Sequence, residues 1–403
     1  MNRVRIQPFD AAEYKELTVA VLGSVDAGKS STIGSLVFNV LDDGNGLSRS
    51  RVFVHDHEKR SGRTSDISFQ YMRNDELKVV ITFVDLAGHE KYLKTTLTGV
   101  TSTQPDYAII CVSDNITRMT KEHIGLCYLF EIPFCILLTK IDADQGTNDT
   151  RVKLSSMLKG QRSTLFEIKN ISDLDKINNT TFSIIPFIKT SNKTGLGLDL
   201  IKALLYRVEH KQYILPDGFS VERIYVVAGH GIVVSGITTF DIKRGDNLLI
   251  GPFLNGTYLS TKVRSIHNNY RFPMEELKAN THGCLAISSN NFKFGQLRKG
   301  MILHRDPPVC CMEFLADIRI LHSSTTVKPG FTGFLNCGVV KESVKIIAMY
   351  KNENAIETAR GGDLFTAKLR FIQNQNVVAI GQRVIFREGL VKGYGTITKI
   401  CID

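Results

Sequence analysis

The stretch GSVDAGKSS, which begins at Gly23, constrains the fold of this chain more than any other feature. Gly23 and Gly28 are followed by Lys29 and Ser30 in the spacing G-x-x-x-x-G-K-[ST]. Glycine lets backbone N–H groups point at phosphate oxygens without interference from a Cβ, and a following helix adds its positive end. In such a loop the lysine reaches the β- and γ-phosphates and the serine hydroxyl binds Mg²⁺. The apolar run LTVAVLG (17–23) and the helix-like SSTIGSLVFNV on either side supply the strand–loop–helix context that the motif requires.

The residues that follow alternate between short apolar runs and helical patterns. Four further runs suit buried strands: VVITFVD (79–85), YAIICVS (107–113), FCILLT (134–139) and SIIPFI (183–188). Helical spacing groups apolar residues on single faces: Leu93, Leu97 and Val100, and then Ile201, Leu204, Leu205 and Val208. Buried strands that alternate with helices are typical of a parallel α/β sheet. We therefore expect an α/β P-loop domain with a mostly parallel sheet and helices on both faces.

The sequence changes character after Leu215. Pro216-Asp217-Gly218 is a strong turn signal, and beyond it strands are short, turns are frequent and helical periodicity is scarce. Asp306-Pro307-Pro308 marks a second break. Short strands separated by turns are typical of an all-β barrel. We expect three domains: the α/β domain over 1–215 and two β-barrel domains over 216–306 and 307–403.

Composition limits the environment and the partners of the chain. The longest apolar runs fall far short of the roughly 18 residues that a membrane span needs, and the N-terminus lacks the apolar core of a signal peptide. We therefore expect a cytoplasmic protein, without a membrane partner, whose eight cysteines stay reduced. The formal net charge is +10, and most of the excess lies after residue 215. A basic surface attracts polyanions, RNA above all, through phosphate contacts and counterion release.

Residues at the ends of later strands narrow the choice of nucleotide. Asp85, in FVDLAGHE, lies where a carboxylate can hold a water of the metal, and Gly88 lies where its N–H can sense a γ-phosphate. In LLTKID, Lys140 can stack on a purine, and Asp142 can accept hydrogen bonds from guanine N1–H and N2–H₂. Adenine has no donors at those positions, so Asp142 favours guanine. The order of these motifs along the chain is the order found in G proteins.

Together these motifs resemble the translational GTPases of the elongation factor Tu class. That family begins with GHVDHGKT and has DxPGHxDY at its second switch; here the two read GSVDAGKS and DLAGHEKY. The chain is most similar to the branch of GTP-binding proteins one and two, with which it shares VDAGKS, SGRTS, GHEKYLKTT, TKID and the SN-x-TG turn. The resemblance covers almost the whole chain and is most specific over 17–142. Later, GHGIVVSG (229–236) and QRVIFREG (382–389) resemble the signatures of the second and last domains. The branch commonly has a longer N-terminus, so any function of that extension is expected to be missing.

The resemblance implies a role for each matching residue. Thr64 is expected to bind Mg²⁺ and report the γ-phosphate, Asp26 to help hold a monovalent cation (K⁺ or Na⁺), and His89 to orient the attacking water. Ser191 resembles the serine of the last guanine-contacting loop. The residues expected to contact GTP or GDP are Gly23, Ser24, Val25, Asp26, Ala27, Gly28, Lys29, Ser30, Ser31, Asp85, Gly88, Thr139, Lys140, Asp142, Ser191 and Asn192. The residues expected to hold metal ions are Ser30, Thr64, Asp85 and Asp26.

Three positions depart from the family pattern. Thr139 replaces the asparagine of NKxD; its hydroxyl could take over part of the ring-contact and loop-bracing role, with lower guanine affinity. Ala87 replaces the proline of DxPG, which favours a more mobile second switch. Arg63 replaces the isoleucine before the switch threonine, and two interpretations stay open: a positive charge on the γ-phosphate supplied in cis, or a solvated or RNA-contacting residue. On the first interpretation the catalytic residues are His89, Lys29, Thr64 and Arg63.

Three functions agree with these features. The first is a GTP-hydrolysing switch of the elongation-factor type that escorts tRNA or acts on the ribosome or related RNA; VERIY (221–225) loosely resembles the start of the family's aminoacyl-end pocket. The second is a GTP-controlled adaptor for RNA-decay or ribosome-rescue complexes. The third, a nucleotide-binding protein without hydrolysis, is disfavoured by a set of intact residues: Lys29, Thr64, Asp85 and His89. We expect a monomer, with a nucleotide-exchange or activating factor as a further candidate partner.

Overall fold

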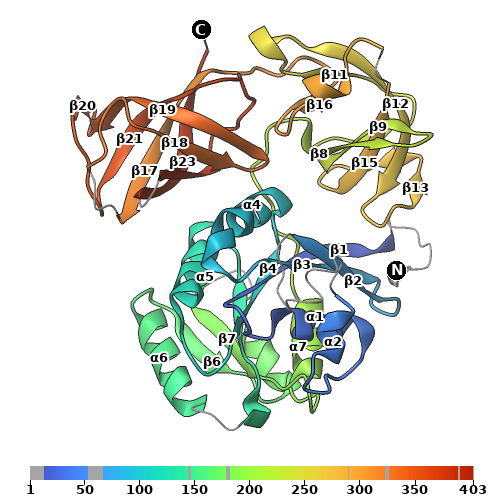
Figure 1. Ribbon diagram of the computed structural model, residues 1–403, viewed down its shortest axis with the longest axis vertical. Helices are drawn as coiled ribbons and strands as arrows, with labels where there is room; N and C mark the ends of the chain where they lie inside the picture. The colour runs from blue at the N-terminus through green and yellow to red at the C-terminus, as the bar shows by residue number, and fades with distance from the viewer. Residues whose placement is uncertain are drawn as a thin grey trace. The chain divides into compact units, whose positions relative to one another are not determined.

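The chain forms two compact units, Met1–Gln212 and Tyr213–Asp403. The computed structural model describes residues 13–52, 67–143, 147–177, 182–288, 290–322, 326–388 and 391–402. The first unit combines a sheet with helices, and the second is built almost entirely from β-strands (Figure 1).

A seven-stranded sheet forms the centre of the first unit. Its strands lie in the order β2-β3-β1-β4-β5-β7-β6, and every neighbouring pair is parallel except β2 and β3. The mostly parallel arrangement confirms the predicted α/β class, while the antiparallel edge strand β2 was not expected. The strands are β1 (Lys15–Gly23), β2 (Ser68–Asn74), β3 (Val79–Asp85), β4 (Tyr107–Val112), β5 (Phe134–Leu138), β6 (Thr164–Glu167) and β7 (Ile184–Lys189).

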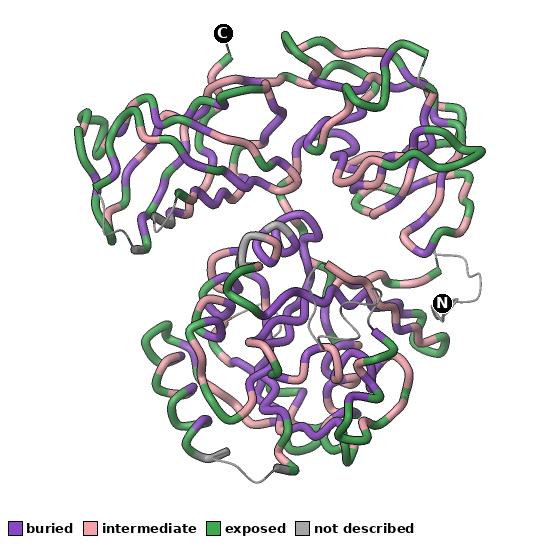
Figure 2. Tube along the Cα trace, in the orientation of Figure 1, coloured by how far each residue is buried: buried purple, intermediate pink, exposed green. Residues whose placement is uncertain are grey.

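Helices cover both faces of this sheet. α1 and α7 pack on one face in a shared apolar core, and α4, α5 and α6 lie on the other (Figure 1). Strands β3, β4 and β5 are buried along their whole length, as expected where both faces are covered (Figure 2). Within the described ranges, no helix has both the length and the apolar character that crossing a bilayer requires. The helices are α1 (Lys29–Phe38), α2 (Leu47–Ser50), α4 (Leu93–Thr103), α5 (Arg118–Leu129), α6 (Thr147–Lys159) and α7 (Leu198–Tyr206).

The carboxyl ends of the parallel strands meet at one edge of the sheet. β1 ends at Gly23, β3 at Asp85, β5 at Leu138 and β7 at Lys189. The segments that follow these ends hold the residues that the motifs single out. The topology therefore gathers distant parts of the sequence around the start of α1, which is where open α/β sheets bind ligands.

The short helix α2 packs directly against α1. A Cβ built on Gly34 of α1 would lie 2.3 Å from the Ser48 carbonyl oxygen of α2. No other residue at Gly34 would allow this approach without displacing the backbone of α2. The contact holds α2 beside the first turns of α1.

The second unit contains two closed six-stranded barrels, as predicted. The first has the order β11-β16-β8-β9-β15-β12 and closes through β11–β12; the second has the order β18-β22-β23-β17-β21-β19 and closes through β18–β19. β13 and β20 extend the two sheets, and β10 pairs with β14. The strands of the first barrel region are β8 (Phe219–Val227), β9 (Gly231–Thr238), β10 (Ile242–Lys243), β11 (Asn247–Gly251), β12 (Leu259–Asn268), β13 (Pro273–Met274), β14 (Glu276–Leu277), β15 (His282–Ile287) and β16 (Ile302–His304). Those of the second are β17 (Glu313–His322), β18 (Thr332–Cys337), β19 (Val340–Lys351), β20 (Asn354–Ala355), β21 (Leu364–Phe371), β22 (Arg383–Glu388) and β23 (Val391–Cys401).

Close packing in the first barrel explains why the motif GHGIVVSG ends in glycine at position 236. A Cβ built on Gly236 of β9 would lie 1.9 Å from the Ser220 carbonyl oxygen of β8. The register of β8 against β9 shifts between Val221 and Arg223, next to this contact. Glycine at this position therefore lets the two strands approach each other closely.

We expect Gly236→Ala to destabilise the second unit by about 1–3 kcal/mol, the usual effect of forcing an extra methyl into a packed interior. Urea unfolding followed by circular dichroism would measure the change. Gly295→Ala is the matched control, because a Cβ at Gly295 would have no heavy atom within 4 Å. Equal unfolding midpoints for the two variants would contradict this account of the motif.

Candidate functional site

The loop between β1 and α1 depends on unusual backbone conformations. Gly23 has φ +146°, and a Cβ there would lie 2.4 Å from the Cys111 carbonyl oxygen. Gly28, at the start of α1, has φ 86°, and Asp26 has φ 60°. Among the described residues no side chain caps the first turn of α1, so its N–H groups are available to an anion.

Lys29 is buried, and its ammonium group turns back onto the loop. Its Nζ donates a hydrogen bond to the Ser24 carbonyl oxygen at 2.8 Å. Burial lowers the pKa of Lys29, and the nearby Asp85 carboxylate works against that shift. A Cβ on Gly88 would lie 2.4 Å from Lys29 Nζ. The missing side chain of Gly88 therefore leaves room for the ammonium group.

Ser30 and Asp85 meet at the start of α1. Ser30 Oγ donates to Asp85 Oδ2 at 2.7 Å, and Asp85 is fully buried at the end of β3. A hydroxyl and a carboxylate next to a phosphate loop are the hard oxygen donors that Mg²⁺ prefers. The donor set of these two residues therefore fits a magnesium site.

The other end of the site comes from the segments after β5 and β7. Ser191 Oγ donates to Asp142 Oδ1 at 2.6 Å and itself accepts from the backbone N–H groups of Lys193 and Thr194. This chain of hydrogen bonds holds the Asp142 carboxylate. Lys140 is exposed, with φ 60°, and lines the pocket.

Thr139 and Asn192 connect these segments to the loop and to α1. Thr139 Oγ1 lies 2.9 Å from the Ala27 carbonyl oxygen and 3.2 Å from that of Val112, so its hydroxyl can brace the loop. The amide of Asn192 donates to Thr32 Oγ1 of α1 at 3.1 Å. The Asn192 amide is thus directed at α1, and its predicted nucleotide contact stays a prediction.

His89 lies at the edge of the pocket with a defined ring orientation. Its Nδ1 accepts a hydrogen bond from the Lys91 N–H at 3.1 Å, and its ring stands at 66° to that of Tyr92. A neutral imidazole that accepts at Nδ1 carries its proton at Nε2. His89 is exposed and can therefore offer an N–H to an oxygen in the pocket.

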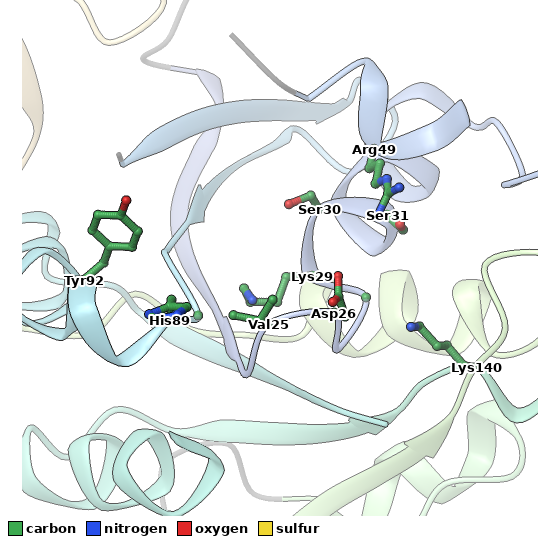
Figure 3. A pocket seen from close by; sticks show the side chains of 11 residues that line it. Val25, Asp26, Lys29, Ser30, Ser31, Arg49, His89, Tyr92 and Lys140 are labelled. Carbon is green, nitrogen blue, oxygen red and sulfur yellow. The ribbon is translucent and has the colours of Figure 1, made fainter. Parts of the chain in front are cut away.

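These elements line a pocket that is partly open to solvent. In Figure 3, His89 and Tyr92 lie at one end, Lys140 lies at the other, and Asp26 and Lys29 lie between them. Four predicted contact residues are not among the described residues that line this pocket: Asp142, which is exposed, and Thr139, Ser191 and Asn192, which are buried. The pocket is lined by Val25, Asp26, Gly28, Lys29, Ser30, Ser31, Arg49, Gly88, His89, Tyr92 and Lys140.

Two predicted residues cannot be placed. Arg63 and Thr64 lie within 53–66, outside the described residues. The metal role of Thr64 and the two interpretations of Arg63 therefore stay predictions.

Sequence reasoning missed three residues of the site. Arg49 and Tyr92 line the pocket. His123 of α5 is buried, and its Nδ1 accepts from the Gly23 N–H at 3.1 Å. Burial, helped by the charge of Lys29, lowers the pKa of His123 to about 3, which keeps the ring neutral. No motif marks these residues, and a lone histidine in a helix gives no signal of such a contact.

Known proteins share sequence with this chain over most of its length. The family model described as Elongation factor Tu GTP binding domain matches residues 15–211. GTP-binding protein 1 of Xenopus laevis is 35% identical over 96% of this chain and 64% of its own length. GTP-binding protein 2 of Homo sapiens is 33% identical over 97% of this chain and 70% of its own length. The chain thus spans about two thirds of the length of these curated relatives.

Solved structures share the fold at lower identity. Bacterial selenocysteine-specific elongation factor EF-Sec has a TM-score of 0.68 at 20% identity, covering 95% of this chain and 58% of that chain. The GTP-bound GTPase-like domain of S. cerevisiae Ski7 has a TM-score of 0.70 at 15% identity, covering 96% and 98%. The shared motifs, the three-part architecture and the identity to the curated relatives lead to one assignment. The chain belongs to the elongation factor Tu-like GTPase family, in the branch of GTP-binding proteins 1 and 2.

Proposed function

We propose that the chain is a GTP-binding and GTP-hydrolysing switch of the translation-factor type. The observation that carries this proposal is the pocket that both Lys29 and Lys140 line. It is also lined by Ser30, whose hydroxyl is bonded to Asp85, and Asp142 follows Lys140 by two residues. Lys29 and the N–H groups of α1 suit the phosphates, and the Asp142 carboxylate, held by Ser191, suits the two donors of guanine. The same residues serve GTP and GDP.

Hydrolysis rests on positioning and charge. Ser30 and Asp85, with Thr64, would hold Mg²⁺, which when bound neutralises charge on the phosphate oxygens. His89 would orient the attacking water through Nε2. Asp26, exposed in the loop, would help hold K⁺ or Na⁺. Two interpretations of Arg63 stay open: it supplies a positive charge to the γ-phosphate, or it is a solvated or RNA-contacting residue.

The partner is proposed to be RNA. The basic excess after residue 215 falls on the two barrels, proposed as domains over 216–306 and 307–403 behind a GTP-binding domain over 1–215. Positive charge of this kind binds RNA phosphates. The likeness of the fold to selenocysteine-specific elongation factor EF-Sec supports tRNA or the ribosome as the partner. We further propose a cytoplasmic monomer whose nucleotide state an exchange or activating factor controls.

We expect Asp142→Asn to weaken GDP binding by roughly 100-fold or more, because two hydrogen bonds to a charged acceptor are disturbed. The variant should instead gain affinity for xanthosine diphosphate, whose base has an acceptor where guanine has its amino group. Titration calorimetry with both nucleotides and Mg²⁺ measures this. Asp149→Asn, at an exposed carboxylate on α6, should behave as wild type. Equal heats from GDP and ADP with the wild-type chain would refute the guanine assignment.

His89→Ala should reduce single-turnover GTP hydrolysis by roughly 100-fold or more, the usual scale for losing one positioned hydrogen-bond donor at a reacting centre. GDP affinity should stay unchanged, because His89 lies at the end of the pocket away from Lys140. Lys91→Ala is the neighbouring control, since that side chain is exposed. A wild-type chain that binds GTP without hydrolysing it, or a His89→Ala variant with full activity, would argue against the proposed mechanism.

Filter binding separates tRNA delivery from an adaptor role. Aminoacylated tRNA, deacylated tRNA and an unrelated RNA are each tested with a non-hydrolysable GTP analogue and with GDP. We expect retention of aminoacylated tRNA in the triphosphate state only. Equal retention of all RNAs in both states would favour the GTP-controlled adaptor for RNA-decay or ribosome-rescue complexes.

A further inference from the structure

Arg49 adds a positive charge to the pocket that none of the motifs assigns. It comes from α2, outside the phosphate loop, and lines the same pocket as Lys29 and Lys140. Within the described part of the chain, no carboxylate forms an ion pair with its guanidinium. A half-buried arginine of this kind is suited to binding an anion.

The backbone around Arg49 leaves room for its side chain and fixes the helix α2 that carries it. Gly46 has φ +96°, and a Cβ there would lie 2.3 Å from Arg49 Nε and 3.0 Å from its Cζ. Asp42 Oδ1 accepts from the N–H and the hydroxyl of Ser48, which fixes the turn that leads into α2. The close contact between Gly34 and Ser48 then fixes α2 against α1. Gly46 therefore leaves room for the arginine side chain, and the other two contacts hold the helix α2 that carries it.

The position of Arg49 along the pocket indicates which part of a nucleotide it meets. Lys29 and Gly88 mark the terminal phosphates, and Lys140 marks the base. The first turn of α1 lies between these ends. In Figure 3, Arg49 reaches toward Ser31 of that turn, at the side of the pocket nearer Lys140 and away from His89. That stretch corresponds to the α-phosphate.

We infer that Arg49 binds the α-phosphate of the guanine nucleotide and so contributes equally to the affinity for GTP and GDP. A guanidinium presents its donors in a planar fork that matches two phosphate oxygens. The inference rests on guanine-nucleotide binding at this loop, as proposed above. It gives Arg49 a different task from His89, since the α-phosphate does not change during hydrolysis.

Equilibrium binding to the full chain tests this assignment. Arg49→Gln should weaken the binding of GDP and of a non-hydrolysable GTP analogue by the same factor, roughly 10-fold to 100-fold, as expected for the loss of a hydrogen bond to a charged group. The nucleotide affinity of Arg49→Lys should lie between those of the wild type and Arg49→Gln, because lysine keeps the positive charge but lacks the planar pair of donors. Gly46→Ala should also weaken the binding of both nucleotides, because the added Cβ would displace the Arg49 side chain.

Arg51→Gln is the matched control, because Arg51 is exposed and its Cζ lies 5.9 Å from the centre of the Phe38 ring instead of lining the pocket. Urea unfolding without nucleotide confirms that the variants are folded. Loss of affinity for the GTP analogue alone would overturn the inference, since it would place Arg49 at the γ-phosphate. Unchanged affinity in Arg49→Gln would overturn it as well. If the wild-type chain binds neither nucleotide, the proposed function fails together with this inference.

Discussion

The ammonium group of Lys29 can be buried only because the surrounding backbone bonds to it and leaves room for it. It lies against the Ser24 carbonyl oxygen and so close to Gly88 that a Cβ there would collide with it. Taking an ammonium group out of water disfavours its charged form, and only part of that effect is offset by Asp85. A bound polyphosphate would supply the missing negative charge. Gly88, which follows β3, therefore leaves the space in which the buried cation lies, and the site is suited to an anion.

The two ends of the pocket are joined by hydrogen bonds between segments far apart in sequence. Thr139 reaches from the end of β5 to the carbonyl of Ala27 in the loop, and Asn192 reaches from the segment after β7 to Thr32 on α1. Because both residues are buried, these contacts are shielded from water. The segments that follow β5 and β7 are therefore bonded directly to the loop after β1 and to α1. A displacement of the segment after β5 or after β7 would therefore also displace the loop or α1.

The sequence predicts this fold wherever the pattern is local. The buried strands β3, β4 and β5 and the change to β-structure after Leu215 follow from short-range signals, and so does the strand–loop–helix at Gly23. The antiparallel strand β2 was missed because nothing in its own residues states the direction of its neighbour. Arg49 was missed for a similar reason: its place in the pocket depends on the packing of Ser48 against Gly34, which no motif records. Asn192 lies in a recognised turn, yet only the three-dimensional structure shows that its amide is directed at α1.

The contact between His123 and Gly23 makes the strand end before the loop sensitive to acid. The folded chain keeps this imidazole neutral down to a pKa of about 3, whereas the unfolded chain would bind a proton near the ordinary value of 6.5. As the pH falls below about 6.5, the unfolded state takes up a proton that the folded state excludes, so the folded state progressively loses stability until the pH nears 3. Acid would therefore destabilise the fold that contains the contact between His123 and Gly23.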